Sequence, residues 1–182
     1  MKSAALTLIT CLLLLILVLP QSLAQSANKK TSVYCEFEPG TFPLHAHSLP
    51  KAVVRSVMHA PESREMLKGE KPADVTPEKL LLGRRIHLAT DGATTFLIIG
   101  SGVLSSADAS WFWIVRQNGK KASILLFDAA NCVDLDSSKT HGYRNVIFYW
   151  ASAGTARTDI FHYNGKVYKL VHEKSRSRGP ND

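Results

Sequence analysis

Residues 111–127 read WFWIVRQNGKKASILLF, and this stretch decides the fold class. Two apolar runs, 111–115 and 124–127, flank Asn118-Gly119, a dipeptide typical of tight β-hairpin turns because both residues tolerate positive φ. The runs are rich in β-branched and aromatic residues, which favour strands. Apolar side chains fall on both faces of each run. We therefore expect cover on both sides, from the other half of a sandwiched or closed sheet on one face and from helices on the other.

The same turn chemistry recurs at Asp91-Gly92 and Asn164-Gly165, each between two strand-like runs. We predict type I′ turns at all three dipeptides. The chain then reads as about seven strands, mostly antiparallel and in meander order, over residues 86–89, 94–99, 111–116, 122–127, 145–151, 158–163 and 166–170. The last of them has the mixed alternation of an edge strand. The predicted fold class is α+β, dominated by an antiparallel β-sheet in a sandwich- or barrel-like arrangement.

Helical patterns are confined to the segment before the sheet. Apolar residues recur every four positions over 49–60, and Pro61 opens a second short turn. A third begins at Thr76-Pro77, which reads as an N-cap followed by proline at the first helical position, and we expect it to stop at Gly83. These short helices are expected to cap the sheet without forming a domain of their own.

The first residues have the layout of a secretory signal peptide. Lys2 precedes an apolar run, 4–19, which is followed by Pro20 and the small-x-small exit Ser22-Leu23-Ala24. A retained membrane anchor is the alternative, and it is disfavoured because the run is shorter than the roughly 20 residues of a spanning helix. We therefore expect residues 1–24 to be removed, no membrane span afterwards, and a secreted or periplasmic mature protein.

The mature chain is expected to have a flexible N-terminus at 25–32, a single α+β domain at 33–172 and a flexible basic tail at 173–182. The whole chain has 22 Lys and Arg against 15 Asp and Glu, a formal charge of +7, and loss of Lys2 with the leader lowers it to +6. Such a balance favours anionic partners in general, so a basic module that binds an anionic polymer is one candidate function.

Two cysteines, Cys35 and Cys132, remain after removal of the leader, which contains Cys11. An even pair in an oxidising compartment predicts a disulfide between them. No Cys-x-x-Cys spacing occurs, so a redox-active thiol pair is disfavoured.

Histidines supply the candidates for a catalytic metal centre. His45-Ala46-His47 in an extended strand would place both rings on one side, and His87 would add a third imidazole, as in hydrolytic zinc sites. No third ligand stands at a diagnostic spacing and H-E-x-x-H is absent. A His-dependent metal hydrolase therefore stays as the enzyme alternative, and we expect no cofactor.

Three further patterns could carry chemistry. Asp134-Leu135-Asp136 resembles the opening of a calcium loop, but the glycine and glutamate that complete one are missing, and a polar turn is preferred. Gly100-Ser101-Gly102 lacks the G-x-S-x-G spacing of a nucleophile elbow. Aromatic residues could stack on sugars or bases, but inside apolar strands they are typical of a core. This set comprises Trp111, Trp113, Trp150, Tyr143, Tyr149 and Tyr163, with Arg116, Arg144 and Arg157 beside them.

Tyr143 is expected to be the most exposed of these rings, because it follows Gly142 at the entrance to a strand. The segments around it, Gly142-Tyr143-Arg144-Asn145-Val146-Ile147, Ser152-Ala153-Gly154-Thr155 and 160–166, resemble the C-terminal part of periplasmic inhibitors of invertebrate-type lysozyme. They are also similar to a broad group of small secreted bacterial proteins of unknown function. Two positions depart from the pattern: Asn145 stands where it has aspartate, and Thr155-Ala156-Arg157 replaces a Gly/Ser run.

The resemblance implies a loop of small residues that enters the cleft of an enzyme, with a nearby cation facing its carboxylates. The candidate binding residues are Ser152, Ala153, Gly154, Thr155, Arg157 and Tyr143. We therefore expect an exported, non-catalytic binding protein that inhibits or senses a cell-wall-active enzyme, with a protein partner in the periplasm or outside the cell.

Overall fold

The computed structural model describes residues 35–177 apart from 43, 90 and 107–108. These residues form nine strands in two antiparallel sheets, each with its strands in chain order. The first sheet contains β1 (Leu44–His45), β2 (Leu81–Ile86), β3 (Thr94–Gly100), β4 (Ser110–Asn118) and β5 (Lys121–Ala130). The second contains β6 (Cys132–Thr140), β7 (Tyr143–Ser152), β8 (Thr155–Tyr163) and β9 (Tyr168–Ser177). The predicted α+β class with a mainly antiparallel meander is confirmed.

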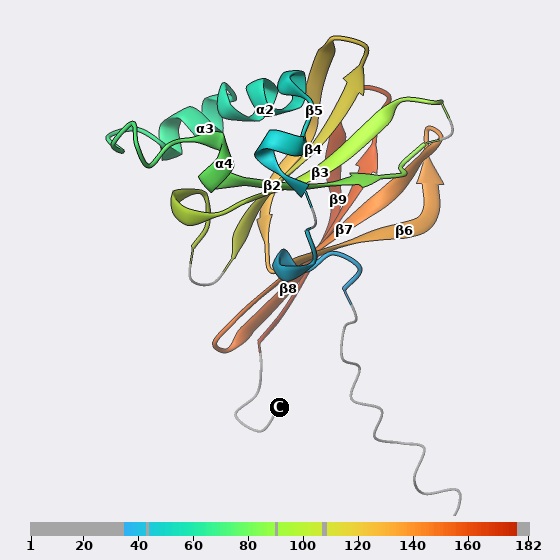
Figure 1. Cartoon of the computed structure of the whole chain (residues 1–182). Coiled ribbons are helices and arrows are strands. Elements are labelled where there is room, and N and C mark those ends of the chain that lie inside the picture. The colour runs from blue at the N-terminus through green and yellow to red at the C-terminus, as the bar shows by residue number, and fades with distance from the viewer. Residues whose placement is uncertain (1–34, 43, 90, 107–108, 178–182) are drawn as a thin grey trace, which may run out of the picture. The chain divides into compact units, whose positions relative to one another are not determined.

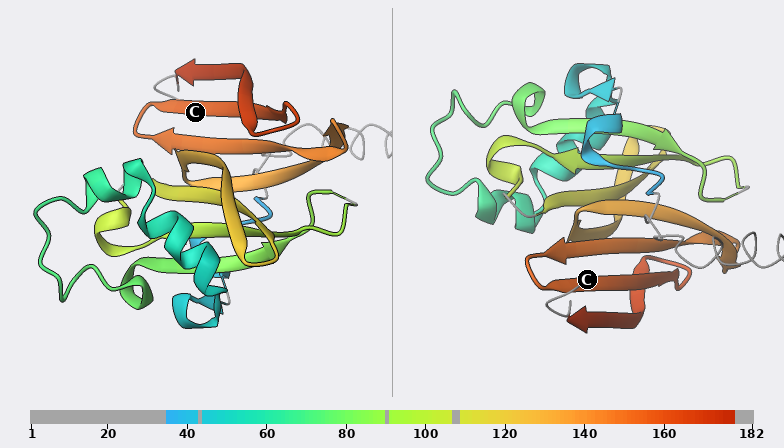
Figure 2. Two further views of the ribbon diagram at one scale, coloured as in Figure 1. Left: turned by 90° about the horizontal axis from the view of Figure 1, so that it is seen from above. Right: turned by 90° about the horizontal axis from the view of Figure 1, so that it is seen from below.

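Short helices cover the first sheet, and the second sheet covers its other face (Figures 1 and 2). The α-helices are α2 (Lys51–Met58), α3 (Pro61–Met66) and α4 (Pro77–Leu80), and the 3-10 helices are η1 (Pro39–Thr41), η2 (Ala46–Ser48) and η3 (Gly102–Leu104). Their starts at Pro61 and Pro77 agree with the sequence prediction. None of the described helices is long and apolar enough to cross a membrane.

Two hydrophobic cores lie on opposite faces of β3 and β4. Leu97 and Phe112 belong to the core shared with the second sheet, together with Phe148 of β7. Their neighbours Ile98 and Trp113 belong to the core under the helices. All of these side chains are almost fully buried. The predicted cover on both faces is therefore confirmed.

The chain passes from the first sheet to the second at a single residue, Asn131. Its backbone N–H donates to the Tyr149 carbonyl at 2.8 Å, and its side-chain oxygen accepts from the Ala151 N–H. A strand that bends into another sheet makes a corner of this kind. β6, which follows the corner, was not predicted because its sequence is mostly polar beyond Leu135 and its pairing with β7 is interrupted there by a register shift.

The predicted disulfide between Cys35 and Cys132 is present, and it joins the segment before the helices to the start of β6. Beside it, Phe37 and Val133 exchange two backbone hydrogen bonds of 3.0 and 3.1 Å. A second link between the sheets is the bridge from Ala89 to Tyr143. The two sheets are thus joined at several places that are far apart in the sequence.

The predicted turns are present in altered form. Asn118 pairs with Lys121, so the central residues of that turn are Gly119 and Lys120, and of these only Gly119 has positive φ, 58°. This is the type II′ pattern, and the predicted type I′ turn is wrong there. Gly165 has φ 94°, while the Asn164 side chain accepts from the Lys166 and Val167 N–H groups at 3.0 Å. Asn118 and Asn164 thus precede the two central residues of their turns.

The third predicted hairpin, at Asp91-Gly92, is not a tight turn. Ile86 pairs with Thr95, and the chain between them leaves the first sheet to bridge with Tyr143. Among the described residues, the two-residue turn whose central residues both have positive φ is His141-Gly142. It joins β6 to β7, with φ values of 50° and 80°.

Three predicted boundaries are wrong. The strand expected at 86–89 is β2, which begins at Leu81 and ends at Ile86. Gly83 does not end a helix, because it lies inside β2, where Leu49 and Ile98 pack against it. Residues 173–177 are not a flexible tail, because β9 continues through them and pairs with β8 as far as Thr155. β9 is an edge strand, as predicted, with a register shift opposite Ile160 and Phe161. The predicted leader at 1–24, the N-terminus at 25–32 and the rest of the tail lie outside the described residues.

We expect Gly83→Ala to lower the free energy of unfolding by about 1–3 kcal/mol. A Cβ at this position would lie 2.8 Å from methyl carbons of both Leu49 and Ile98, closer than a Cβ can pack, so one or both of these buried side chains must shift. Gly40→Ala is the matched control, since a Cβ there meets nothing within 4 Å, and its effect should stay within about 0.5 kcal/mol. Urea unfolding of both variants checks this, and equal effects would contradict the close packing at Gly83.

Replacing Cys35 and Cys132 together by serine should lower the free energy of unfolding by about 2–5 kcal/mol, because the disulfide closes a loop with a sequence separation of 97 residues. Unfolding in urea under non-reducing conditions measures the difference. Mass spectrometry after thiol alkylation should find both cysteines of the native protein unmodified, and two alkylated thiols in the folded protein would contradict the bridge.

Candidate binding site

The predicted binding loop is the tip of the hairpin between β7 and β8. Ser152 pairs with Thr155, so Ala153 and Gly154 form the turn, with φ 90° at Gly154. Ala153, Gly154 and Thr155 are exposed, and Ser152 is half-buried. The hairpin and the end of β9 extend beyond the first sheet at the lower left of Figure 1. The structure thus places these four small residues together on a projecting β-hairpin.

Backbone pairing continues along the whole hairpin. β7 and β8 pair from Val146 and Phe161 to the last residues before the turn, and β9 pairs with β8 from Tyr163 to Thr155. The tip is therefore the end of a three-stranded ribbon, and pairing holds the turn in one orientation.

Arg157 lies at the base of the tip but is not a free cation. Its Nε is 2.8 Å from the Asp159 carboxylate, and its guanidinium lies 5.9 Å from the ring centre of Trp150, its neighbour across the strands. The side chain is partly exposed, so its charge still contributes to the field near the tip. Arg157 therefore stabilises the hairpin through Asp159 and Trp150. That it also contacts a binding partner stays a prediction.

The Asp159 carboxylate is buried between the sheets, with 3 % of the residue exposed. Its Oδ1 has no hydrogen-bond partner among the described residues. Burial raises the pKa of Asp159, the nearby carboxylates of Asp128 and Glu173 raise it further, and Arg157 opposes them. The ion pair that braces the hairpin therefore contains a carboxylate that folding makes harder to ionise.

Tyr143 is not exposed, so this part of the prediction is wrong. Only 5 % of the residue is accessible, its hydroxyl donates to Asp91 Oδ2 at 2.6 Å, and its ring stacks on Tyr163 with the ring centres 4.1 Å apart. Burial raises the pKa of Tyr143, and the hydrogen bond to Asp91 adds to the effect. The bridge between Ala89 and Tyr143 brings Asp91 to the Tyr143 hydroxyl. Tyr143 consequently takes no part in the hairpin surface.

The aromatic residues do not gather on one platform. Trp113 is fully buried under the helices, where Phe127 lies between it and Trp111 at ring distances of 5.2 and 5.0 Å. Tyr163 is buried between the sheets, and Trp150 is half-buried beside Arg157. Most of these rings fill the two cores, in agreement with the preferred interpretation.

The predicted geometry of the histidines is wrong. His45 ends β1 opposite Leu82, but η2 begins at the next residue, so His45-Ala46-His47 is not an extended strand. His87 lies five residues beyond Leu82 and is exposed. Within the described ranges no three His, Cys, Asp or Glu residues are placed to hold a metal ion. The histidines therefore give no geometric support to the metal hydrolase.

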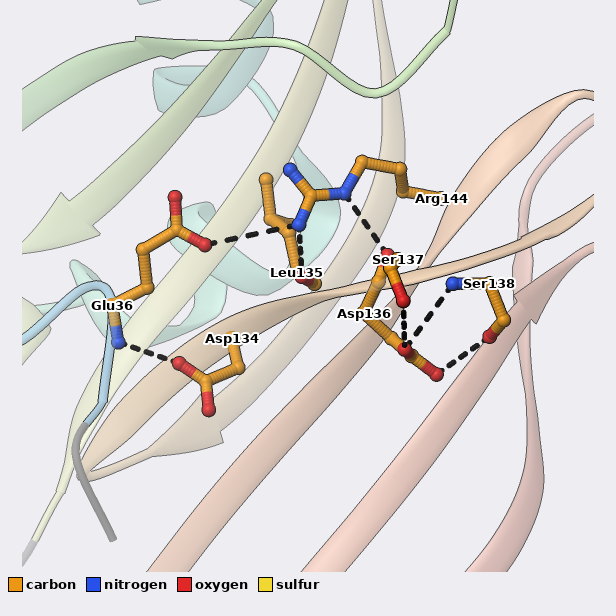
Figure 3. Close-up of polar contacts among 7 residues, drawn as sticks. All are labelled: Glu36, Asp134, Leu135, Asp136, Ser137, Ser138 and Arg144. Carbon is orange, nitrogen blue, oxygen red and sulfur yellow. Dashed lines mark hydrogen bonds and ion pairs between the residues drawn. The ribbon is translucent and has the colours of Figure 1, made fainter.

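Asp134 and Asp136 both lie on β6 and not on a separate polar turn (Figure 3): Asp134 pairs regularly with Ile147, and Asp136 lies in the irregular part after Leu135. Asp134 accepts from the Glu36 N–H at 2.5 Å, and Asp136 accepts from the Ser138 hydroxyl at 2.5 Å. The bonds from Ser138 and Ser137 lower the pKa of Asp136. Arg144 donates to the carbonyls of Asp136 and Leu135 across the register shift. The Asp134 carboxylate thus holds the N-terminal segment at Glu36, and the oxygens of Leu135 and Asp136 serve the irregular part of β6.

Sequence reasoning missed Trp150 and Asp159 as the residues that hold Arg157. The available signal was the two-residue spacing from Arg157 to Asp159, which puts both side chains on one face of a strand.

Comparison of the chain with protein-family models, with curated proteins and with solved structures finds no match. The support for the candidate site therefore comes from the geometry of the hairpin itself.

Asp159→Asn should change how stability depends on pH. Because the folded-state pKa of Asp159 is raised, the folded protein binds its proton more tightly, and this group lowers stability as pH rises from its unfolded value of about 4 through its folded value. The variant lacks that decline, so its free energy of unfolding relative to the native protein should increase between pH 4 and pH 7. Urea unfolding at several pH values measures it. A difference that is constant or shrinks over this range would contradict the raised pKa.

Proposed function

We propose that this protein is an exported, non-catalytic binding protein that inserts the tip of its β7–β8 hairpin, residues 152–155, into a cleft of another protein. The observation that supports this is the exposure of small side chains at the end of a projecting, fully paired ribbon. A narrow tip of this kind fits a groove that bulky side chains could not enter, and its pairing on β7 and β9 lowers the ordering cost of binding.

The partner that fits this surface is an enzyme with an acidic cleft. Backbone N–H groups at the turn are suited to carboxylate oxygens, and Arg157 places a cation at the base of the tip. The formal charge of +6 expected for the mature chain also favours approach to an acidic surface. The resemblance over residues 142–166 names a lysozyme or another cell-wall-active enzyme as the target class.

Export is part of this proposal. The disulfide between Cys35 and Cys132 is consistent with an oxidising compartment. The apolar leader at 1–24 is the sequence feature that would direct the chain there. A secreted or periplasmic protein would meet cell-wall-active enzymes directly.

The proposal is tested by inhibition of a panel of lysozymes, including the invertebrate type, by the mature native protein. Ala153→Arg and Gly154→Arg should each weaken inhibition by roughly tenfold or more, because an arginine at the turn makes the tip too wide for a cleft. Ala153→Arg carries the main comparison, since the positive φ of Gly154 adds backbone strain to the second variant.

Ala73→Arg is the matched control, because it adds the same side chain at another exposed alanine, outside the hairpin. It should leave inhibition unchanged. Circular dichroism confirms that all variants are folded. No inhibition of any lysozyme by the native protein would remove the lysozyme version, and equal inhibition by Ala153→Arg and the native protein would remove the hairpin from the site.

A further inference from the structure

A basic hollow lies where the β4–β5 turn meets the β8–β9 turn. Its volume is about 360 Å³, and it opens between the two sheets. The first sheet contributes Arg116, Asn118, Lys121, Ser123 and Leu125, and the second contributes Tyr163, Gly165 and Lys166. Residues about 45 positions apart in the sequence thus form one concave surface. This surface is called the inter-sheet hollow below.

The inter-sheet hollow is separate from the hairpin tip. Tyr163 ends β8 at the hollow, and Thr155 begins β8 at the tip. A strand of nine residues spans about 30 Å, so the two surfaces lie at opposite ends of the second sheet. The inference therefore goes beyond the proposed function.

Three cations converge on the hollow, and one carboxylate offsets them in part. Arg116 is 3.0 Å from Asp91, whereas Lys121 and Lys166 are exposed and have no ion pair in the described part of the chain. Three positive charges less the charge of Asp91 leave +2 at the hollow. A ligand with two negative charges would balance it.

Arg116 also has unused hydrogen-bonding capacity. Its terminal nitrogen Nη2 donates to Asp91, and the rest of the guanidinium makes no hydrogen bond among the described residues; because the Nε is buried, the terminal nitrogens are the donors that can serve a ligand. Asn118 and Ser123 add neutral donors beside it. A guanidinium with free donors and two ammonium groups suits an oxygen-rich anion, because charge-assisted hydrogen bonds to such oxygens are strong.

The hollow also has an apolar side. Leu125 and Tyr163 are nearly buried and line it, and the Tyr163 hydroxyl is already used on the Gly165 carbonyl at 3.1 Å. An apolar wall beside polar donors is typical of sites for organic ligands. The ligand class is therefore an anion that carries an organic group.

We propose that the inter-sheet hollow binds a phosphate monoester, with Arg116, Lys121 and Lys166 around the phosphate dianion and Leu125 and Tyr163 against its organic group. The phosphate belongs either to a small molecule or to the end of a phosphorylated polymer. The two turns place the lysines: Lys121 is the first residue after the β4–β5 turn and Lys166 lies within the β8–β9 turn, and Gly119 and Gly165 adopt the positive φ that these turns require.

The test is isothermal titration calorimetry of the mature protein with two probes, phenyl phosphate and a polysaccharide phosphorylated at its end. The double variant Lys121→Gln, Lys166→Gln should bind at least roughly tenfold more weakly than the native protein. The control is Lys120→Gln, Lys169→Gln, which removes the same charge from exposed lysines outside the hollow and should bind as the native protein does.

Binding of phenyl phosphate with the expected difference between the variants supports the site and a small-molecule source. Binding of the polysaccharide alone, with the same difference, supports the site and a polymer source. Equal losses in the two double variants would overturn the proposal in favour of a general charge effect. Failure of both probes to bind the native protein below about 1 mM would overturn it as well. Inhibition of lysozymes through the hairpin is independent of each of these results.

Discussion

The double burial of β4 is the constraint on which the rest of the structure depends. Phe112 and Ile114 point to one face of the first sheet and Trp113 and Val115 to the other, and all four are fully buried. Each such side chain contributes about 1.5–3 kcal/mol only when it is removed from water. A sheet that is covered on one face only leaves the side chains of its other face in water. This strand therefore requires packing against both faces of the sheet. The short helices supply one cover, and the second sheet supplies the other.

Each cover is attached by a small number of local devices. The helices approach closely because Gly83 has no side chain where Leu49 packs. The second sheet follows directly from the first at Asn131, which bonds to β7 through its backbone and its side chain. The disulfide and the bridge at Phe37 attach the N-terminal segment to the same corner. Both candidate surfaces result from this arrangement, one at the free end of the second sheet and one at the open mouth between the sheets.

The sequence was informative about features whose cause is local, such as the apolar strands, the proline starts of the helices and the presence of turns. It was misleading where a distant partner decides. The sequence predicts an exposed Tyr143, but the ring is buried and its hydroxyl donates a hydrogen bond to Asp91, 52 positions away. The charged end of β9, residues 173–177, was expected to be a flexible tail, but it pairs with β8. The hairpin was visible as a run of small residues, but its brace at Asp159 was not, because the burial of Asp159 depends on the opposite sheet. The inter-sheet hollow combines two turns that no local pattern connects.

The outer edge of β9 has one more consequence. A long edge strand exposes unpaired peptide groups on which another copy of the chain can add, the first step toward amyloid-like growth. Here the register shift at Val171 interrupts the regular hydrogen-bonding ladder, and Lys169, Lys174 and Arg176 place positive charge along the same strand. Two such edges would repel each other and mismatch where they meet. The strand that supports the projecting hairpin thus carries two of the features, a bulge and charged side chains, by which natural edge strands avoid such pairing.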